Sequence, residues 1–386
     1  MTKKKLPTQL IHERSGGRPN LTVNPGVERG STLLMPNIDS LYEAGRQTYG
    51  RIGSAVHREL EAALCSLENA TQAQLAPTGV GACALAIASV VKSGDHILVA
   101  DNVYGPTRRF CRRRLRAMGV EATFFPSRIG ADLSDFITEK TTAILMESPG
   151  SLTFELCDTK AIVALAKDRG IVTLLDNTWG CGVLHRPLDL GVDISIQALT
   201  KYVVGHADCF GGAVMTASDK AARAVKNTAT DWGTTLGPDD AYSALRGLRT
   251  IVPRVNAHDA AGRKIAEWIK NEDAVTDVLH PALPSHPDHH IWQRDFSGAN
   301  GLFGIRLEDR GDAAFRAFFD SLELFGLGFS WGGYESLAIP ADPDAIRQEG
   351  HWLNDTTDRL IRLHVGLEDV GDLQDDLNRA LKAYRA

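Results

Sequence analysis

The sequence of 386 residues contains no uninterrupted apolar run long enough to cross a membrane as a helix. It begins with a basic stretch, Lys3-Lys4-Lys5, but Pro7, Glu13 and Gly16-Gly17 interrupt the residues that follow, and the apolar core of a signal peptide is missing. It also has no C-x-x-C pair, and its six cysteines are widely spaced. These absences predict a reduced, cytoplasmic protein whose thiols serve mainly as small hydrophobic side chains. The cysteines are Cys65, Cys83, Cys111, Cys157, Cys181 and Cys209.

The chain has no excess of positive charge, because 42 Lys and Arg residues stand against 48 Asp and Glu residues, for a net charge of −6. This balance gives no reason to expect nucleic acid or a membrane surface as a partner. One dense basic run lies in a segment with a helical pattern, and we expect it to be a solvated helix face. It consists of Arg108, Arg109, Arg112, Arg113, Arg114 and Arg116.

Short apolar runs alternate with helical patterns through the first two thirds of the chain. Residues 96–100, 143–146 and 171–175 are such runs, and residues 159–168 have a helical pattern between two of them. Continuous apolar strands of this length, alternating with helices, predict an α/β fold with a mainly parallel sheet covered on both faces.

Changes in this rhythm predict three parts. Residues 1–53 have little periodicity and several prolines, which indicates an extended arm. Residues 54–255 form the large α/β domain, which starts with a helix over about 56–67. Residues 256–386 form a smaller α+β domain, with a helix over 261–270 and strands over 302–307, 324–330 and 360–365.

Two polar residues follow strand-like runs in the large domain. Asp176 ends the run Leu174-Leu175, and Lys201 comes 25 residues later. Taken singly, Asp176 would be interpreted as a helix cap and Lys201 as a surface charge. Open α/β sheets, however, place ligand-binding groups at the carboxyl ends of their strands, so the pair favours a binding site.

Several segments carry a shared set of motifs in a fixed order. They are Tyr49-Gly50-Arg51, Glu147-Ser148-Pro149-Gly150-Ser151, Asp176-Asn177-Thr178-Trp179, Gln197-Ala198-Leu199-Thr200-Lys201-Tyr202, Gly205-His206-Ala207-Asp208, Ser330-Trp331-Gly332-Gly333-Tyr334-Glu335-Ser336 and Leu360-Ile361-Arg362-Leu363-His364-Val365-Gly366. Over nearly the whole chain this set resembles the pyridoxal 5'-phosphate (PLP)-dependent enzymes of cysteine and methionine metabolism. The resemblance implies the type I fold of PLP-dependent transferases (aspartate-aminotransferase-like), with a large mainly parallel sheet domain and a smaller C-terminal α+β domain.

In this family Lys201 corresponds to the lysine that forms the Schiff base with PLP. An amine on a flexible stem suits that role, and once released it is placed to remove the substrate α-proton. Asp176 would keep the pyridine nitrogen protonated, so that the ring accepts electrons. Tyr104 matches the tyrosine that stacks on the ring and exchanges protons with the substrate; otherwise it is an ordinary half-buried tyrosine before a helix.

The cofactor phosphate needs hydrogen-bond donors. Gly79 and Val80 precede a helical run, so their amides would face an anion at a helix N-terminus, and Thr200 would add a hydroxyl. The resemblance implies that Tyr49 and Arg51 reach the phosphate of the neighbouring subunit, in a homo-oligomer whose dimers share active sites, as a dimer of dimers. The chain departs from many relatives at Ala198, where they have a phosphate-binding serine.

The substrate is expected to be a small amino acid. Arg362, an arginine in an apolar strand, would hold its α-carboxylate through two parallel hydrogen bonds. By resemblance, Ser330 and Trp331 would lie beside that carboxylate, and Tyr242 would line the pocket. Ile52 offers no polar group where some relatives have a second arginine for the distal end of the substrate.

Within the family the chain resembles the bacterial cystathionine β-lyases most closely. Gly150-Ser151-Leu152 stands where relatives with γ-chemistry have an Asn-Pro pair, and Trp331 and His364 are also typical of the β-lyases. The implied reaction is β-elimination of cystathionine to homocysteine, pyruvate and ammonia. Cysteine-S-conjugate β-lyase, cystathionine γ-lyase and cystathionine γ-synthase remain alternatives.

Two other interpretations of the sequence remain open. Residues 79–84 fit G-x-G-x-x-A, with Asp101 22 residues after Gly79, as in an NAD-binding Rossmann oxidoreductase. Pro77 interrupts the strand that this motif needs, and Lys201 would have no role. The other is a PLP-fold protein without catalysis, which the lysine, aspartate and arginine argue against. For the histidines a surface loop is expected rather than a metal site. They are His280, His286, His289 and His290.

Overall fold

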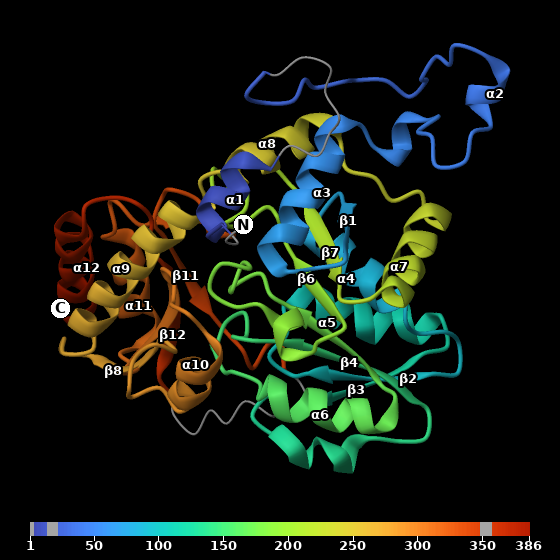
Figure 1. The fold of residues 1–386 in the computed structure, drawn as a ribbon. Helices are drawn as coiled ribbons and strands as arrows, with labels where there is room; N and C mark the ends of the chain where they lie inside the picture. Colours follow the sequence, from blue (N-terminus) through green and yellow to red (C-terminus); the bar gives the residue numbers. More distant parts are fainter. Residues whose placement is uncertain (1–3, 14–21, 348–356) are drawn as a thin grey trace.

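The computed structural model describes residues 4–13, 22–347 and 357–386. Two sheets dominate it, a large one formed by residues 72–216 and a small one formed by residues 275–364. Figure 1 shows the small sheet and the C-terminal helix on one side of the molecule and the large sheet on the other. No helix within these described ranges is long and apolar enough to span a membrane.

The large sheet has seven strands in the order β1-β7-β6-β5-β4-β2-β3. Five of them, β3, β2, β4, β5 and β6, are parallel to one another, whereas β7 runs antiparallel to both of its neighbours. The strands are β1 (Gln72–Ala76), β2 (His96–Ala100), β3 (Glu121–Phe125), β4 (Thr141–Glu147), β5 (Val172–Asp176), β6 (Ile194–Gln197) and β7 (Gly212–Thr216).

Helices cover both faces of this sheet (Figure 1). Along β7, Val214 belongs to one hydrophobic cluster whereas Ala213 and Met215 belong to the other, as the two-residue repeat of a strand requires when both faces are buried. The helices are α3 (Ala55–Glu68), α4 (Gly79–Ala88), α5 (Gly105–Phe110), η2 (Cys111–Leu115), η3 (Gly130–Phe136), α6 (Thr159–Arg169), η4 (Pro187–Leu190), α7 (Asp219–Asp231) and α8 (Pro238–Leu248).

The small sheet has five strands in the order β10-β11-β12-β9-β8, and only the β10–β11 pair is parallel. A third hydrophobic cluster lies between this sheet and its helices. The strands are β8 (Val275–Leu279), β9 (Leu302–Leu307), β10 (Gly326–Leu327), β11 (Leu337–Ala341) and β12 (Arg359–His364). The helices are α9 (Ile251–Ile269), α10 (His289–Asp295), α11 (Gly311–Asp320) and α12 (Val370–Arg385).

The described residues of the N-terminal part form three short helices, α1 (Leu6–His12), α2 (Ile38–Leu41) and η1 (Gly50–Ile52). In Figure 1 the segment that carries α2 extends away from the body of the molecule. Many of its apolar side chains are exposed, which a monomer has no reason to maintain over one continuous segment. They are Val23, Leu34, Ile38, Leu41, Tyr42, Tyr49 and Ile52.

The predicted fold class is confirmed, since a mainly parallel sheet lies between helices and a second sheet follows it. The strand predicted over 324–330 is reduced to β10, because residues 323–325 form a bend and only Gly326 and Leu327 pair with β11. The three-part division of the chain stays a prediction, and α9 runs continuously through its boundary at residue 255.

The interruption expected at Pro77 is wrong, because β1 directly precedes α4. The Rossmann interpretation fails for a different reason. In that motif the strand before the glycine-rich turn pairs in parallel with the next one, whereas β1 lies at one edge of the sheet, antiparallel to β7 and five positions away from β2.

Two expectations about surface polarity hold only in part, since Arg109, Arg113, Arg114, Arg116 and His290 are exposed as expected but three other residues are buried. Arg108 is buried and forms an ion pair with Asp101, so it is not part of a solvated face. His280 and His286 are buried rather than exposed in a surface loop. Burial lowers the pKa of His280 to about 3 and that of His286 to about 4, so both act as neutral hydrogen-bonding side chains.

Candidate active site

Lys201 lies in the turn that follows β6, at the carboxyl edge of the large sheet. Its Nζ atom donates a hydrogen bond to Ser330 Oγ at 2.7 Å and lies 5.3 Å from the centre of the Trp331 ring. Burial and the nearby Arg362 lower the pKa of the amine to about 8, although Asp176 acts in the opposite direction. A lysine with this pKa is partly neutral near pH 7, which is the form that reacts with an aldehyde.

Asp176 is the last residue of β5, and its two carboxylate oxygens have different partners. Oδ1 accepts hydrogen bonds from the amide of Thr178 at 3.0 Å and from its hydroxyl at 2.5 Å. Oδ2 accepts from the thiol of Cys83 at 3.5 Å. Burial raises the pKa of Asp176, and the hydrogen bonds from Thr178 and the charge of Lys201 oppose this rise. One oxygen is therefore fixed by the protein, and the other is held only by a weak donor.

The N-terminus of α4 lies against the Lys201 turn. Thr78 caps the helix by accepting from the amide of Gly81 at 3.0 Å, and the helix geometry leaves the amides of Gly79 and Val80 without intrahelical partners. A Cβ atom on Gly79 would lie 2.5 Å from Cβ of Ala198, so only glycine permits this close approach. The two amides are thus available to an anion beside Lys201.

Thr200 has a structural partner in this structure. Its hydroxyl donates to the carbonyl of Gly211 at 3.2 Å and accepts from the amide of the same residue at 3.1 Å. Both bonds fix the turn that carries Lys201. A role of Thr200 in binding phosphate stays a prediction, and it would require the hydroxyl to turn away from Gly211.

Tyr104 directly precedes α5 and has 43% of its surface exposed. Its amide donates to Glu147 Oε2 at 2.7 Å. Burial raises the pKa of the Tyr104 phenol, and the charge of Arg362 opposes this rise. Glu147 ends β4 and pairs in register with Asp176. Burial and Asp176 raise the pKa of Glu147 well above its usual range, which favours the protonated form of Glu147 beside Asp176.

Arg362 comes from β12 of the small sheet and is buried. Its Nη2 donates to the carbonyl of Ser330 at 3.2 Å, and burial lowers its pKa to about 10. Trp331 packs at 5.5 Å from the ring of Tyr202. The structure therefore brings Arg362, Ser330 and Trp331 from the smaller C-terminal part to Lys201 of the large sheet.

The structure does not bring Tyr49, Arg51 or Tyr242 into this group. The guanidinium of Arg51 lies 5.9 Å from the centre of the Tyr49 ring, and the carbonyl of Arg51 accepts from the Thr235 hydroxyl at 3.2 Å. Tyr242 packs against the hydrophobic cluster that contains Ala213 and Met215. Within the described ranges, none of the three has a hydrogen bond, ion pair or ring contact with Lys201, so their predicted roles are not explained by a single chain.

Two residues of the site were missed from the sequence. Glu147 was part of a quoted motif, and its place at the end of β4 gave the same signal that singled out Asp176 at the end of β5. Cys83 was interpreted only as a small hydrophobic residue, and no local pattern indicates its contact with Asp176.

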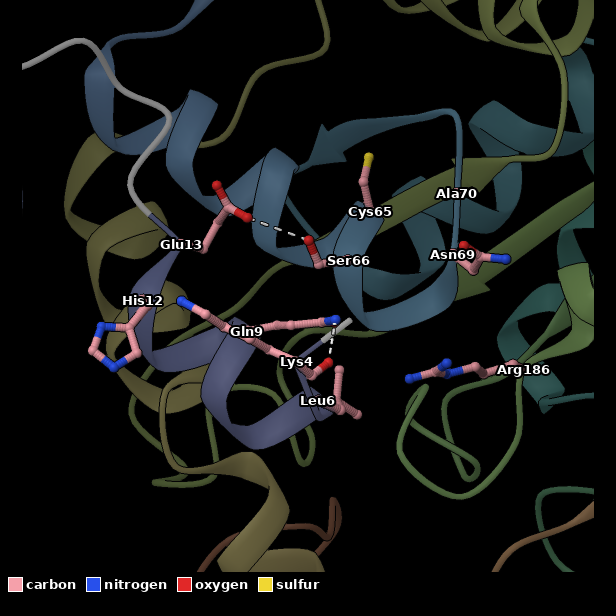
Figure 2. A pocket seen from close by; sticks show the side chains of 10 residues that line it. All are labelled: Lys4, Leu6, Gln9, His12, Glu13, Cys65, Ser66, Asn69, Ala70 and Arg186. Carbon is pink, nitrogen blue, oxygen red and sulfur yellow. Dashed lines mark hydrogen bonds between the residues drawn. The ribbon is translucent and has the colours of Figure 1, made fainter. Parts of the chain in front are cut away.

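A cavity of about 740 Å³ lies elsewhere, between α1 and α3, and Figure 2 shows Arg186 pointing across it toward α1. Its lining contains none of the residues grouped around Lys201. It is lined by Lys4, Leu6, Gln9, His12, Glu13, Cys65, Ser66, Asn69, Ala70 and Arg186. Within the described part of the chain, no three His, Cys, Asp or Glu side chains are arranged to hold a metal ion.

The site fits PLP. A buried amine of lowered pKa would take the aldehyde of PLP. A carboxylate with one weakly held oxygen would take the ring nitrogen, and a helix N-terminus with two available amides would take the phosphate. The fold and the site thus define a PLP-dependent enzyme of the type I fold.

Comparison with known proteins agrees with this class. The sequence profile of the family "Cys/Met metabolism PLP-dependent enzyme" matches residues 7–382. The chain belongs to this family, so the prediction of PLP as cofactor is confirmed.

Relatives cover nearly the whole chain. A putative cystathionine β-lyase of Rhizobium johnstonii is 42% identical over 94% of this chain and 92% of its own length. Cystathionine β-lyase MetC of Escherichia coli is 38% identical over 98% of both chains. A solved structure of cystathionine γ-synthase from Xanthomonas oryzae pv. oryzae, in complex with aminoacrylate and cysteine, is 29% identical and has a TM-score of 0.91, covering 100% of this chain and 99% of its own.

Proposed function

We propose that the chain catalyses the β-elimination of cystathionine to homocysteine, pyruvate and ammonia. The observation that carries the proposal is the Lys201 amine, held at 2.7 Å from Ser330 Oγ between the charges of Asp176 and Arg362. The proposal is also supported by the names of the relatives from Rhizobium johnstonii and Escherichia coli.

Each side chain has a task in this reaction. PLP, when bound, supplies the electron sink for the pair of electrons left on Cα when its proton is removed. Lys201 takes that proton, and Arg362 orients the substrate by its α-carboxylate. Asp176 would hold the ring nitrogen of PLP and keep it protonated, since its carboxylate keeps one weakly held oxygen. Homocysteine leaves from Cβ as a thiolate, which Lys201 or Tyr104 protonates, and water then releases pyruvate and ammonia.

The active site is proposed to be shared between subunits. Tyr49 and Arg51 are exposed within one chain, and the segment that carries them presents several apolar side chains to solvent. We expect this segment to lie on the neighbouring subunit of a homodimer, with Arg51 near the phosphate of that subunit, and two such dimers to associate.

A γ-acting enzyme is the second candidate, because the structural relative from Xanthomonas oryzae is a cystathionine γ-synthase. Pyruvate as the product of cystathionine supports β-elimination, and 2-oxobutyrate supports γ-chemistry. A β-lyase that acts on cystine or other S-conjugates would release pyruvate from those compounds in preference to cystathionine.

The test combines the visible absorption of PLP with a product assay. The purified protein is predicted to be yellow and to release pyruvate from L-cystathionine, whereas Lys201→Ala is predicted to lose the wild-type band and the activity. A protein that stays colourless after PLP is added contradicts the assignment of the site. A coloured protein that releases no 2-oxo acid from cystathionine contradicts the proposed substrate.

A further inference from the structure

The turn over residues 330–333 brings two of the substrate-site residues to Lys201. Ser330 and Gly332 both have positive φ angles, of 94° and 83°. Such a conformation is costly for a serine, so the turn needs support from outside. A Cβ atom on Gly332 would lie 2.9 Å from the carbonyl carbon of Lys201, so the turn lies directly against the lysine.

His364 supplies such support. It ends β12, two residues after Arg362, and side chains two residues apart lie on the same face of a strand. The amide of Gly332 donates to His364 Nε2 at 3.1 Å. One strand therefore carries the proposed carboxylate ligand and also the acceptor that fixes the turn beside it.

The partners of two buried histidines specify which nitrogen carries a proton. His258 Nδ1 lies 2.9 Å from the carbonyl of Val365, which can only accept, so this nitrogen is protonated and Nε2 carries a lone pair. The Gly332 amide can only donate, so His364 Nε2 carries a lone pair and its proton is on Nδ1. The centres of the His258 and His364 rings lie 5.3 Å apart.

The carbonyl of Gly333, also 3.1 Å from His364 Nε2, would favour the opposite tautomer. That tautomer would deprive the Gly332 amide of its acceptor. The tautomer protonated on Nδ1 keeps the hydrogen bond from the backbone amide of Gly332, and the Nδ1 proton then has no hydrogen-bond partner among the described residues. We take this tautomer because it satisfies the backbone donor of the turn.

The charged state of His364 is opposed by its burial and by the positive groups that face it. A second proton on the ring is opposed by three neighbouring groups, which are His258 of α9, Arg362 of β12 itself and Lys201 of the turn after β6. Burial, followed by His258, lowers the pKa of His364 to about 3. The ring is therefore neutral throughout the working range of the protein.

We propose that His364 is a positioning residue that, as a neutral imidazole protonated on Nδ1, accepts from the Gly332 amide and holds the 330–333 turn against Lys201 and Arg362. Only the expected effect of this role on substrate binding rests on the proposed function. Tyr202, the neighbour of Lys201, packs at 6.1 Å from the His364 ring and at 5.5 Å from that of Trp331, so the turn and the lysine share one rigid support.

Substitutions separate this role from general stability. His364→Leu leaves the Gly332 amide without an acceptor, whereas the amide oxygen in His364→Gln replaces it. We expect His364→Leu to raise KM for L-cystathionine about tenfold with a smaller change in kcat, since one unsatisfied buried donor costs about 1.4 kcal/mol in substrate-bound geometry. His364→Gln should stay within about threefold of the wild type.

His280 provides the matched control. It is equally buried, and its Nδ1 accepts from the amide of Ala282 at 3.2 Å, away from the site. His280→Leu is expected to lower the melting temperature without changing KM. An unchanged KM in folded His364→Leu, an equal KM change in His280→Leu, or failure of His364→Gln to restore KM would each overturn the proposal.

The tautomer gives a test that does not depend on activity. In protein labelled with 15N-histidine, the His364 signals, assigned by their loss in His364→Gln, should show a protonated Nδ1 and an unprotonated Nε2 from pH 6 to 8. A protonated Nε2 would overturn the inference even if His364→Leu does not fold. If the wild type releases no 2-oxo acid from any sulfur amino acid, the proposed function fails, and the NMR result still decides the tautomer.

Discussion

Asp176→Asn tests the proposed chemistry with little change in shape. The side-chain oxygen of the introduced amide can still accept both hydrogen bonds from Thr178, so the loop after β5 keeps its two anchors. The substitution removes the negative charge and places an amide nitrogen where Oδ2 now lies beside Cys83. The cofactor pocket is therefore preserved, while the charge that holds the proton on the ring nitrogen is lost.

The expected loss follows from that charge. At about 4 Å and an effective dielectric constant of about 20, two unit charges interact by about 4 kcal/mol. Since about 1.4 kcal/mol corresponds to a tenfold change in rate, kcat should fall by about a thousandfold. The assay is pyruvate release from L-cystathionine under saturating substrate, with bound PLP measured on the same sample.

Asp193→Asn is the control for this substitution. Asp193 Oδ2 accepts from the amide of Thr173 at 2.8 Å and from its hydroxyl at 2.9 Å, at the opposite end of β5. It therefore repeats the hydrogen-bond pattern of Asp176 away from the site, and its variant should keep kcat. An Asp176→Asn enzyme with more than about a tenth of the wild-type kcat would refute the electrostatic reasoning, since that leaves less than about 1.4 kcal/mol for the charge. Loss of PLP would refute the claim that the pocket is preserved.

Three further predictions concern the subunit arrangement, the lysine and the second carboxyl group. Refolding a mixture of the Arg51→Ala and Lys201→Ala proteins should recover activity, because a site shared between subunits then places one intact Arg51 beside one intact Lys201. No recovery of activity would contradict the shared site. In PLP-free protein, Lys201→Met should be more stable than the wild type at pH 7, because the wild-type lysine carries an unfavourable buried charge at that pH. As the pH rises from about 8 toward the pKa of lysine in the unfolded chain, the folded wild type loses this proton before the unfolded chain does. The difference in melting temperature between the two proteins should therefore shrink. Glu147→Gln should change kcat less than about threefold, because burial and Asp176 favour the uncharged acid and the glutamine oxygen can still accept from the Tyr104 amide. Glu147→Ala should lower kcat about tenfold by leaving that amide without its acceptor, and equal losses in steady-state kcat would contradict this.

The strands of the fold were predictable where most residues of a run are apolar. The run predicted over 302–307 coincides with β9, and that over 360–365 is displaced by one residue from β12. The strand β1 was missed because Pro77 follows directly after it and was expected to interrupt a strand there. Tertiary pairing with β7 at the sheet edge, which no local pattern reveals, forms this strand.

The grouping of the proposed site was predictable because its residues lie at the ends of strands or in recognisable motifs, as Asp176 and Lys201 do. Contacts across the molecule were not predictable. The bond from Cys83 to Asp176, and that from Gly332 to His364, join segments that are 93 and 32 residues apart in the sequence. The exposed Arg51 marks a different limit, because its expected partner belongs to a second chain.

The most direct test of the central claim is identification of the 2-oxo acid released from L-cystathionine by the PLP-loaded wild-type protein, with Lys201→Ala as the blank. Beta-elimination by Lys201 predicts pyruvate in equal amount to homocysteine, and none from the variant. Release of 2-oxobutyrate with cysteine would contradict β-elimination, and pyruvate release by Lys201→Ala at the wild-type rate would contradict the role of the lysine.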